Sequence, residues 1–195
     1  SGADPSAGSS QGEAIRAAIE EADRLLATFN ALLRIAELES GARLDQTAPV
    51  DLSEVARSAA DLYEPVAEEK GFTLSVMAEP GVRIRGDRHL LSQALANLLD
   101  NALKYAGNGK IELRVFPKNG QAILEVADQG LGIPEADRQS VLDRFVRLEP
   151  SRTTPGNGLG LSLVRAIARR HDGSVTLEDN RPGLRVRLQF ARLPT

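Results

Sequence analysis

Four short motifs in a fixed order constrain the fold of this chain more than any other feature of its sequence. Asn-Leu-Leu-Asp-Asn-Ala-Leu-Lys-Tyr occupies residues 97–105, and Asp-Gln-Gly-Leu-Gly-Ile-Pro occupies residues 128–134. A lone Phe145 and the run Gly-Asn-Gly-Leu-Gly-Leu at residues 156–161 follow. Each motif is weak evidence alone. Together they supply carboxamides for a metal, a carboxylate for the edge of a base and glycines for phosphates, so the combination predicts a nucleotide site.

Length, composition and charge exclude several classes of protein. A chain of 195 residues suits one domain with an appendage. The net charge of −3 argues against a nucleic-acid partner, and the absence of cysteine excludes disulfides and zinc–thiolate sites. No apolar run approaches the ~18–20 residues that span a bilayer. We therefore expect a cytoplasmic location without membrane contact, and the sequence leaves open whether a longer parent protein is anchored in the inner membrane.

The sequence divides into four segments. Residues 1–11 contain no apolar side chain larger than alanine and are expected to form a disordered tail or the remnant of a loop. In residues 12–40, apolar side chains recur every three or four positions, which predicts one long amphipathic helix that needs a partner for its apolar stripe. Residues 41–50 lack periodicity and are expected to be a linker. Residues 51–193 then form the main domain.

The main domain alternates between helix and strand patterns. Asp51 is expected to cap its first helix, and Gly71 to end that helix. The periodicity predicts helices over 51–70, 88–106, 134–142 and 159–171, and strands over 73–78, 82–85, 110–116, 121–127, 174–178 and 184–190. The predicted fold is an α/β (α+β) two-layer sandwich, in which a mixed sheet of five or six strands carries helices on one face and one long helix precedes it.

The helix over residues 88–106 has an apolar stripe and a polar side. Asn97, Asn101 and Lys104 are spaced at i, i+4 and i+7, so they share the side opposite the leucines. Two carboxamides and one ammonium suit an anionic ligand with a hard cation, because amide oxygens can ligate Mg²⁺. The alternative is a solvated helix face, although asparagine is a poor helix former and two on one stripe need a reason.

The carboxylate of Asp128 follows an apolar strand and precedes Gly130 and Gly132. A carboxylate fixed at this point can accept a hydrogen bond from an exocyclic amino group. The glycines would let the backbone approach a flat ring closely. The alternative is an ordinary turn after a strand, where aspartate and glycine are common.

The last motif opens the helix over residues 159–171. Glycine-rich turns at helix N-termini expose N–H groups that suit phosphates. The segment just before it is rich in turn formers and is expected to be a mobile flap. Arg147 and Arg152 are candidates to place positive charge against phosphate oxygens. The alternative is a flexible loop with solvated arginines.

These motifs resemble the N, G1, F and G2 boxes of sensor histidine kinases. The resemblance identifies residues 51–193 as an ATP-binding catalytic domain with the Bergerat-type fold of the GHKL superfamily. Residues 12–40 resemble the second helix of the dimerisation and phosphoacceptor hairpin. The resemblance implies ATP and Mg²⁺ as cofactors. It also implies that the complete protein transfers the γ-phosphoryl group to a histidine, for relay to the receiver domain of a response regulator.

The resemblance also implies roles for individual residues. Asn101 would ligate Mg²⁺ with support from Asn97, and Lys104 would contact phosphate. Tyr105 would lie against the adenine, and Asp128 would bond the adenine amino group. Arg147 would help Mg²⁺ and Lys104 neutralise charge during transfer. The remaining implied nucleotide contacts are Gly130, Gly132, Ile133, Phe145 as the lid anchor, Arg152, Gly156, Gly158, Leu159, Gly160 and Leu161.

Two features separate this chain from parts of that superfamily. Hydrolytic members carry a glutamate four residues before the metal asparagine, where this chain has Asn97. A carboxamide is not a general base, so the site resembles one that holds ATP for transfer. The family's acceptor motif, His-Glu-x-x-x-Pro, is also missing from this sequence. Its two histidines, His89 and His171, are interpreted as structural.

The missing acceptor leaves two further questions open. The helix over residues 12–40 still has an apolar face to bury, which suits a homodimer through this helix. The alternative to a kinase is a regulatory module that binds nucleotide and sequesters a partner through the same helix without transferring phosphate.

Overall fold

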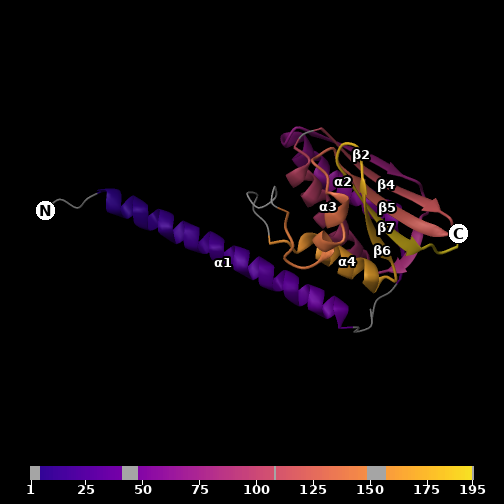
Figure 1. Ribbon diagram of the computed structural model, residues 1–195, viewed down its shortest axis with the longest axis horizontal. Helices are drawn as coiled ribbons and strands as arrows, with labels where there is room; N and C mark the ends of the chain where they lie inside the picture. The colour runs from indigo at the N-terminus through magenta and orange to yellow at the C-terminus, as the bar shows by residue number, and fades with distance from the viewer. Residues whose placement is uncertain (1–4, 41–47, 108, 149–156, 195) are drawn as a thin grey trace.

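A single long helix lies beside a domain built from a sheet and helices (Figure 1). The computed structural model describes residues 5–40, 48–107, 109–148 and 157–194. The long helix is α1 (Pro5–Glu39), and the other elements belong to the domain. Of the helices in these ranges, none combines the length and the apolar character that a bilayer span requires.

The domain is built on a mixed sheet of five strands, as the sequence predicted. Its strand order is β2-β4-β5-β7-β6, in which β2 and β4 run parallel and the other neighbours run antiparallel. The strands in chain order are β2 (Phe72–Ala78), β4 (Gly109–Lys118), β5 (Gln121–Ala127), β6 (Ser174–Asp179) and β7 (Leu184–Ala191). One face of the sheet carries three helices, α2 (Leu52–Glu69), α3 (Arg88–Tyr105) and α4 (Gly160–Arg170).

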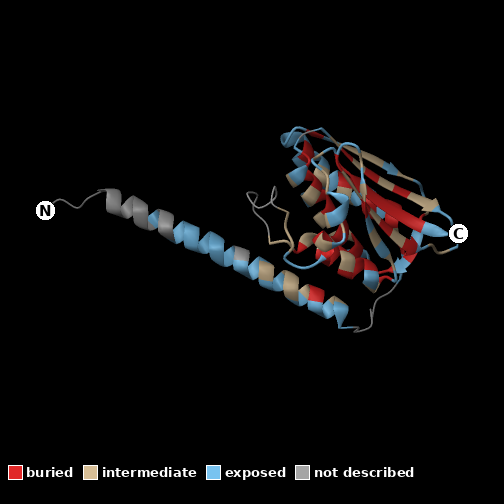
Figure 2. Cartoon of the chain, viewed as in Figure 1, coloured by how far each residue is buried: buried red, intermediate tan, exposed pale blue. Residues whose placement is uncertain are grey.

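The hydrophobic core lies between this sheet and its helices (Figure 2). The apolar stripe of α3 is buried as predicted, and the sheet contributes alternate side chains of β4, β5 and β7. Burying a leucine fully stabilises the fold by ~1.5–3 kcal/mol. The buried residues of the stripe are Leu91, Leu95, Leu98 and Ala102.

The opposite face of the sheet is charged, which explains why helices cover only one side. Glu125 on β5 is buried there, and Arg187 of β7 donates to it over 2.6 Å. Arg187 also donates to Glu178 of β6 over 2.6 Å, and Arg114 of β4 lies 3.8 Å from Glu125. These cross-strand pairs satisfy the buried carboxylate, because each charge meets an opposite charge on the neighbouring strand.

Local sequence sets several element ends, of which the Asp51 cap was predicted. Asp51 caps α2, because its Oδ1 accepts hydrogen bonds from the backbone N–H groups of Ser53 at 2.9 Å and Glu54 at 3.3 Å. The hairpin of β4 and β5 turns through Asn119 and Gly120, whose φ angles of 51° and 76° suit a two-residue turn.

Three predictions were wrong. The expected tail over 1–11 is helical from Pro5 despite Gly8 and Gly12, because a helix that is already nucleated extends at little cost; residues 1–4 lie outside the described ranges. The expected linker over 41–50 ends in strand β1 (Ala48–Asp51), which pairs with β3 (Arg83–Gly86), while residues 41–47 are not described. The expected helix over 134–142 is two 3₁₀ turns instead, because its buried side chains, Val141 and Leu142, are adjacent rather than spaced on one helical face.

Helix α1 docks on α4 through its C-terminal half. Ile35 is completely buried in this contact, and Glu39 pairs with Arg144. Thr28 accepts a hydrogen bond from the Asn157 carboxamide at 3.2 Å. Several large apolar side chains of α1 stay exposed within this chain: Ile15, Ile19, Leu25, Leu26, Phe29 and Leu33. The apolar stripe is therefore only partly covered.

His171 joins the end of α4 to the start of α3. Its Nε2 accepts a hydrogen bond from the Asp87 N–H at 3.0 Å, and its Nδ1 lies 2.7 Å from the Ile167 carbonyl oxygen. The ring is therefore neutral with its proton on Nδ1, because a carbonyl oxygen can only accept. Burial lowers the pKa of His171 below its ordinary value.

We predict that His171 makes folding sensitive to acid. The unfolded chain binds a proton on this ring near its ordinary pKa of about 6.5, whereas the folded chain binds it only at lower pH. The stability that the neutral ring supplies is therefore complete above pH ~6.5 and falls as the pH drops below that value. Urea unfolding gives the free energy of unfolding at pH 7.5 and at pH 5.5. The decrease in this free energy from pH 7.5 to pH 5.5 should be smaller in His171→Gln than in the wild type. His89→Gln, at an exposed position, should match the wild type; equal losses in all three proteins would contradict this account.

Candidate functional site

The carboxylate of Asp128 is buried at the end of β5. The residue is only 8% exposed, and its Oδ1 accepts hydrogen bonds from the Gly130 N–H at 2.8 Å and the Leu184 N–H at 3.2 Å. Among the described residues, both donors to this side chain bind Oδ1. The other carboxylate oxygen, Oδ2, is therefore left for a ligand. Burial raises the pKa of Asp128, and the two N–H donors oppose that rise. A donor on a ligand would favour the ionised form further.

The loop after Asp128 fits tightly between two other segments. A Cβ at Gly130 would lie 2.5 Å from the Tyr105 carbonyl oxygen at the end of α3. Gly132 lies against the carbonyl of Gly183 in the turn that joins β6 to β7. These glycines therefore let segments of the protein approach each other, a different reason from the approach to a flat ring that the sequence suggested. Ile133 continues the loop and packs against the core.

The two carboxamides of α3 face the start of α4. A Cβ at Gly160 would lie 3.5 Å from the Asn101 Nδ2 and 3.5 Å from the Asn97 Oδ1. The Asn97 Nδ2 donates to the carbonyl oxygen of Gln93 at 2.9 Å, so its own oxygen is the end presented toward Gly160. The structure thus brings together the first and last motifs, which are separated by more than 50 residues in the sequence.

Lys104 and Tyr105 end α3 next to the Asp128 loop. The Lys104 ammonium lies 4.8 Å from the centre of the Tyr105 ring, a cation–π distance. The Tyr105 ring is exposed, while its carbonyl oxygen adjoins Gly130. An exposed aromatic ring at the end of the helix that adjoins the Asp128 loop offers a surface for a flat ligand.

Phe145 is joined to the glycine motif by a backbone hydrogen bond. Its N–H donates to the Gly158 carbonyl oxygen at 3.0 Å, and the residue is 56% exposed. Arg147 is half-buried, Leu159 is buried at the N-terminus of α4, and Leu161 packs against the core. Arg152 and Gly156, which the sequence also assigned to the site, lie outside the described residues.

The candidate metal ligands in the described part of the chain are carboxamides rather than a carboxylate cluster. No group of three or more His, Cys, Asp or Glu side chains there is placed to hold a metal ion. The oxygens of Asn97 and Asn101 suit Mg²⁺, which usually keeps several waters and takes its other ligands from substrate phosphates. The donor set therefore fits a magnesium ion that arrives with its ligand.

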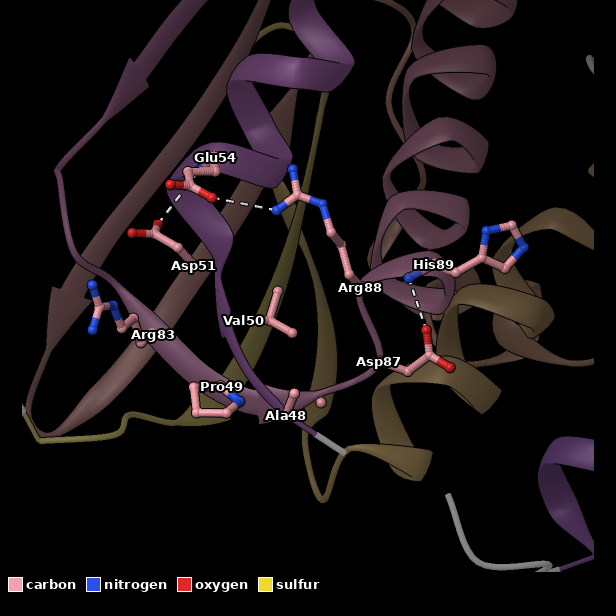
Figure 3. A pocket seen from close by; sticks show the side chains of 10 residues that line it. Ala48, Pro49, Val50, Asp51, Glu54, Arg83, Asp87, Arg88 and His89 are labelled. Atoms are coloured by element: carbon pink, nitrogen blue, oxygen red, sulfur yellow. Dashed lines mark hydrogen bonds and ion pairs between the residues drawn. The ribbon is translucent and has the colours of Figure 1, made fainter. Parts of the chain in front are cut away.

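A separate surface pocket lies at the starts of α2 and α3 (Figure 3). It contains none of the predicted site residues. Asp51 and Asp87 use their carboxylates there as helix caps, and Glu54 pairs with Arg88 at 3.4 Å. Its two aspartates serve as helix caps and its glutamate is paired with an arginine, so the candidate site remains at Asp128 and the asparagine pair.

Sequence reasoning missed the contribution of the turn between β6 and β7. Leu184 donates to the Asp128 carboxylate, and Asn180 donates to the Asp128 carbonyl oxygen at 2.7 Å. The only local sign was the Pro-Gly pair at residues 182–183, which indicated a turn but not the element it would contact.

Comparisons with known proteins agree on one family. The model for histidine kinase-, DNA gyrase B- and HSP90-like ATPases matches residues 86–194. The sensor-like histidine kinase SenX3 of Mycolicibacterium smegmatis is 32% identical over 162 residues, which cover 82% of this chain and 42% of that protein. The chain therefore spans about two fifths of the length of this curated relative.

Solved structures show the same arrangement of elements. Full-length ShkA in complex with AMPPNP aligns with a TM-score of 0.81 and 28% identity, covering 95% of this chain and 40% of that chain. The mycobacterial sensor histidine kinase MprB aligns with a TM-score of 0.67 and 29% identity, covering 77% of this chain and all of that chain. The first alignment extends over nearly the whole chain.

Proposed function

Because this chain belongs to the family of histidine kinase-, DNA gyrase B- and HSP90-like ATPases, we propose that it binds ATP with Mg²⁺ and, in the complete protein, presents the γ-phosphoryl group to a histidine. The observation that carries this proposal is the buried Asp128 carboxylate, with Oδ1 tied to the backbone and Oδ2 left for a ligand. ShkA, which aligns over 95% of this chain, was solved with AMPPNP bound.

Asp128 selects the base in this proposal. Adenine carries an exocyclic amino group at C6, which donates to a carboxylate, whereas guanine carries a carbonyl oxygen there, which would be repelled. A charge-assisted hydrogen bond in a buried site contributes ~1.5–3 kcal/mol. The exposed ring of Tyr105 would lie against the base.

The phosphates would lie between α3 and the start of α4. Asn101 would hold Mg²⁺ through its carboxamide oxygen, with Asn97 beside it. Bound Mg²⁺ supplies positive charge that neutralises the phosphate oxygens. Lys104 and Arg147 add charge from the protein, and the N–H groups at the start of α4 face the same region. Catalysis would then rest on positioning and on charge neutralisation.

Transfer to a separate nucleophile fits this site better than hydrolysis. The Asn97 amide already donates to the Gln93 carbonyl oxygen, and a carboxamide cannot take a proton from water. The site would therefore keep the γ-phosphoryl group until an acceptor arrives. Steady phosphate release at rates typical of enzymes would instead indicate a hydrolytic ATPase.

The acceptor and the relay partner would lie outside this sequence. The buried ring of His171 is engaged on both nitrogens, and His89 begins α3 near the separate pocket of Figure 3. We propose an acceptor helix elsewhere in the complete protein, the receiver domain of a response regulator as the next partner, and a homodimer through the exposed apolar residues of α1. The site would face the cytoplasm, where ATP is available.

We predict that nucleotide binding depends on Asp128. Asp128→Asn keeps Oδ1 for the two N–H donors but replaces Oδ2 with an amide donor, which meets the donor of adenine. Titration of a fluorescent ATP analogue with Mg²⁺ should show affinity lower by at least about tenfold than in the wild type. Asp61→Asn, which alters an exposed carboxylate on α2, is the matched control and should bind as the wild type does. Equal affinity in all three proteins would overturn the adenine site.

We also predict histidine phosphorylation by the complete protein. Incubation with γ-labelled ATP and Mg²⁺ should give a label that is stable to base and labile to acid, as phosphohistidine is. Asn101→Ala should abolish this label while thermal melting shows an intact fold. If the wild type binds ATP tightly but never labels a histidine, the regulatory module is the correct reading.

A further inference from the structure

We propose that Asn180 is a positioning residue, which holds the main chain of Asp128 so that Oδ2 meets the exocyclic amino group of the purine. Asn180 does not need to touch the nucleotide, because it acts through Asp128. This inference rests on the proposed function, in which Asp128 binds that amino group.

The turn between β6 and β7, residues 180–183, together with Leu184 holds three polar atoms of Asp128. The Asn180 Nδ2 donates to the Asp128 carbonyl oxygen at 2.7 Å. The Asp128 N–H donates to the Leu184 carbonyl oxygen at 2.9 Å, and the Leu184 N–H donates to Oδ1 at 3.2 Å. Only the Asn180 contact is made by a side chain, so it is the one that substitution can remove.

Arg185 fixes the orientation of the Asn180 carboxamide. Its Nη2 donates to the Asn180 Oδ1 at 2.8 Å. A guanidinium has donors only, so the atom that faces it must be the oxygen, and the nitrogen must then face the Asp128 carbonyl. The positive charge of Arg185 also polarises the carboxamide, which strengthens the donor on its far side.

The turn has no room to shift toward the main-chain carbonyl of Asp128. Gly183 is buried with φ of 110°, and a Cβ there would overlap the Asp128 carbonyl oxygen. The Asn180 N–H also donates to the Gly183 carbonyl oxygen at 3.0 Å, which closes the turn. Loss of the Asn180 donor removes the side-chain hydrogen bond to the Asp128 carbonyl oxygen, so we expect the Asp128 peptide to tilt, and hydrogen bonds weaken steeply with misalignment.

The test compares two nucleotides that differ only in the amino group. ATP and purine riboside 5′-triphosphate, which lacks the group at C6, are titrated against the complete chain with Mg²⁺. Asn180→Asp keeps an acceptor for Arg185 but places an oxygen against the Asp128 carbonyl. We expect ATP affinity to fall by about tenfold and affinity for the other nucleotide by less than about threefold. The preference for ATP should therefore shrink.

Controls separate this inference from the proposed function and from loss of folding. Asp179→Asn alters an exposed neighbour in the same hairpin and should keep the wild-type preference. If Asn180→Asp does not fold, Arg185→Met removes the donor that orients Asn180 and should also reduce the preference. A folded variant that weakens both nucleotides equally, or neither, overturns the positioning role while the proposed function stands. A wild type that does not prefer ATP overturns both.

Discussion

The site depends on one carboxylate that the fold takes out of water. Removing an ionised group from water costs free energy unless donors replace the lost hydration. The protein supplies two backbone N–H groups to Oδ1 of Asp128 and none to Oδ2 from the described residues. Its raised pKa indicates that this compensation is incomplete. A ligand that donates to Oδ2 would complete it, so binding and the protonation state of Asp128 are linked.

The close approach of α3 and α4 forms the second part of the candidate site, where the metal and the phosphates would lie. Gly160 has no side chain, so the start of α4 can lie against the carboxamides of Asn97 and Asn101. Helix α1 touches the same region through Glu39 to Arg144 and Thr28 to Asn157, residues that flank Phe145 and Gly158. The helix with the exposed apolar stripe is thus in direct contact with the borders of the candidate site.

Local patterns predicted most of the fold. The leucine stripe of α3 and the Asp51 cap each depend on neighbours in sequence, and both are present. Strand β1 was missed because it is four residues long and exists only through its pairing with β3. The expected helix over 134–142 failed for a related reason, since its apolar residues have no helical spacing.

The motifs also predicted which residues would gather, but not what holds them. Asp128 was proposed as a site residue from its place after an apolar strand. Asn180 was not, because it is 52 residues away and contacts a carbonyl oxygen, which any residue supplies. Main-chain contacts of this kind leave no pattern in the sequence.

A crystal structure of the chain with AMPPNP and Mg²⁺ tests the central claim most directly. The account predicts the exocyclic nitrogen of adenine about 2.8–3.2 Å from the Asp128 Oδ2, with the Asn101 carboxamide oxygen about 2.1 Å from the metal. A nucleotide bound with its base away from Asp128, or a cavity at Asp128 filled by the protein's own side chains, would contradict it.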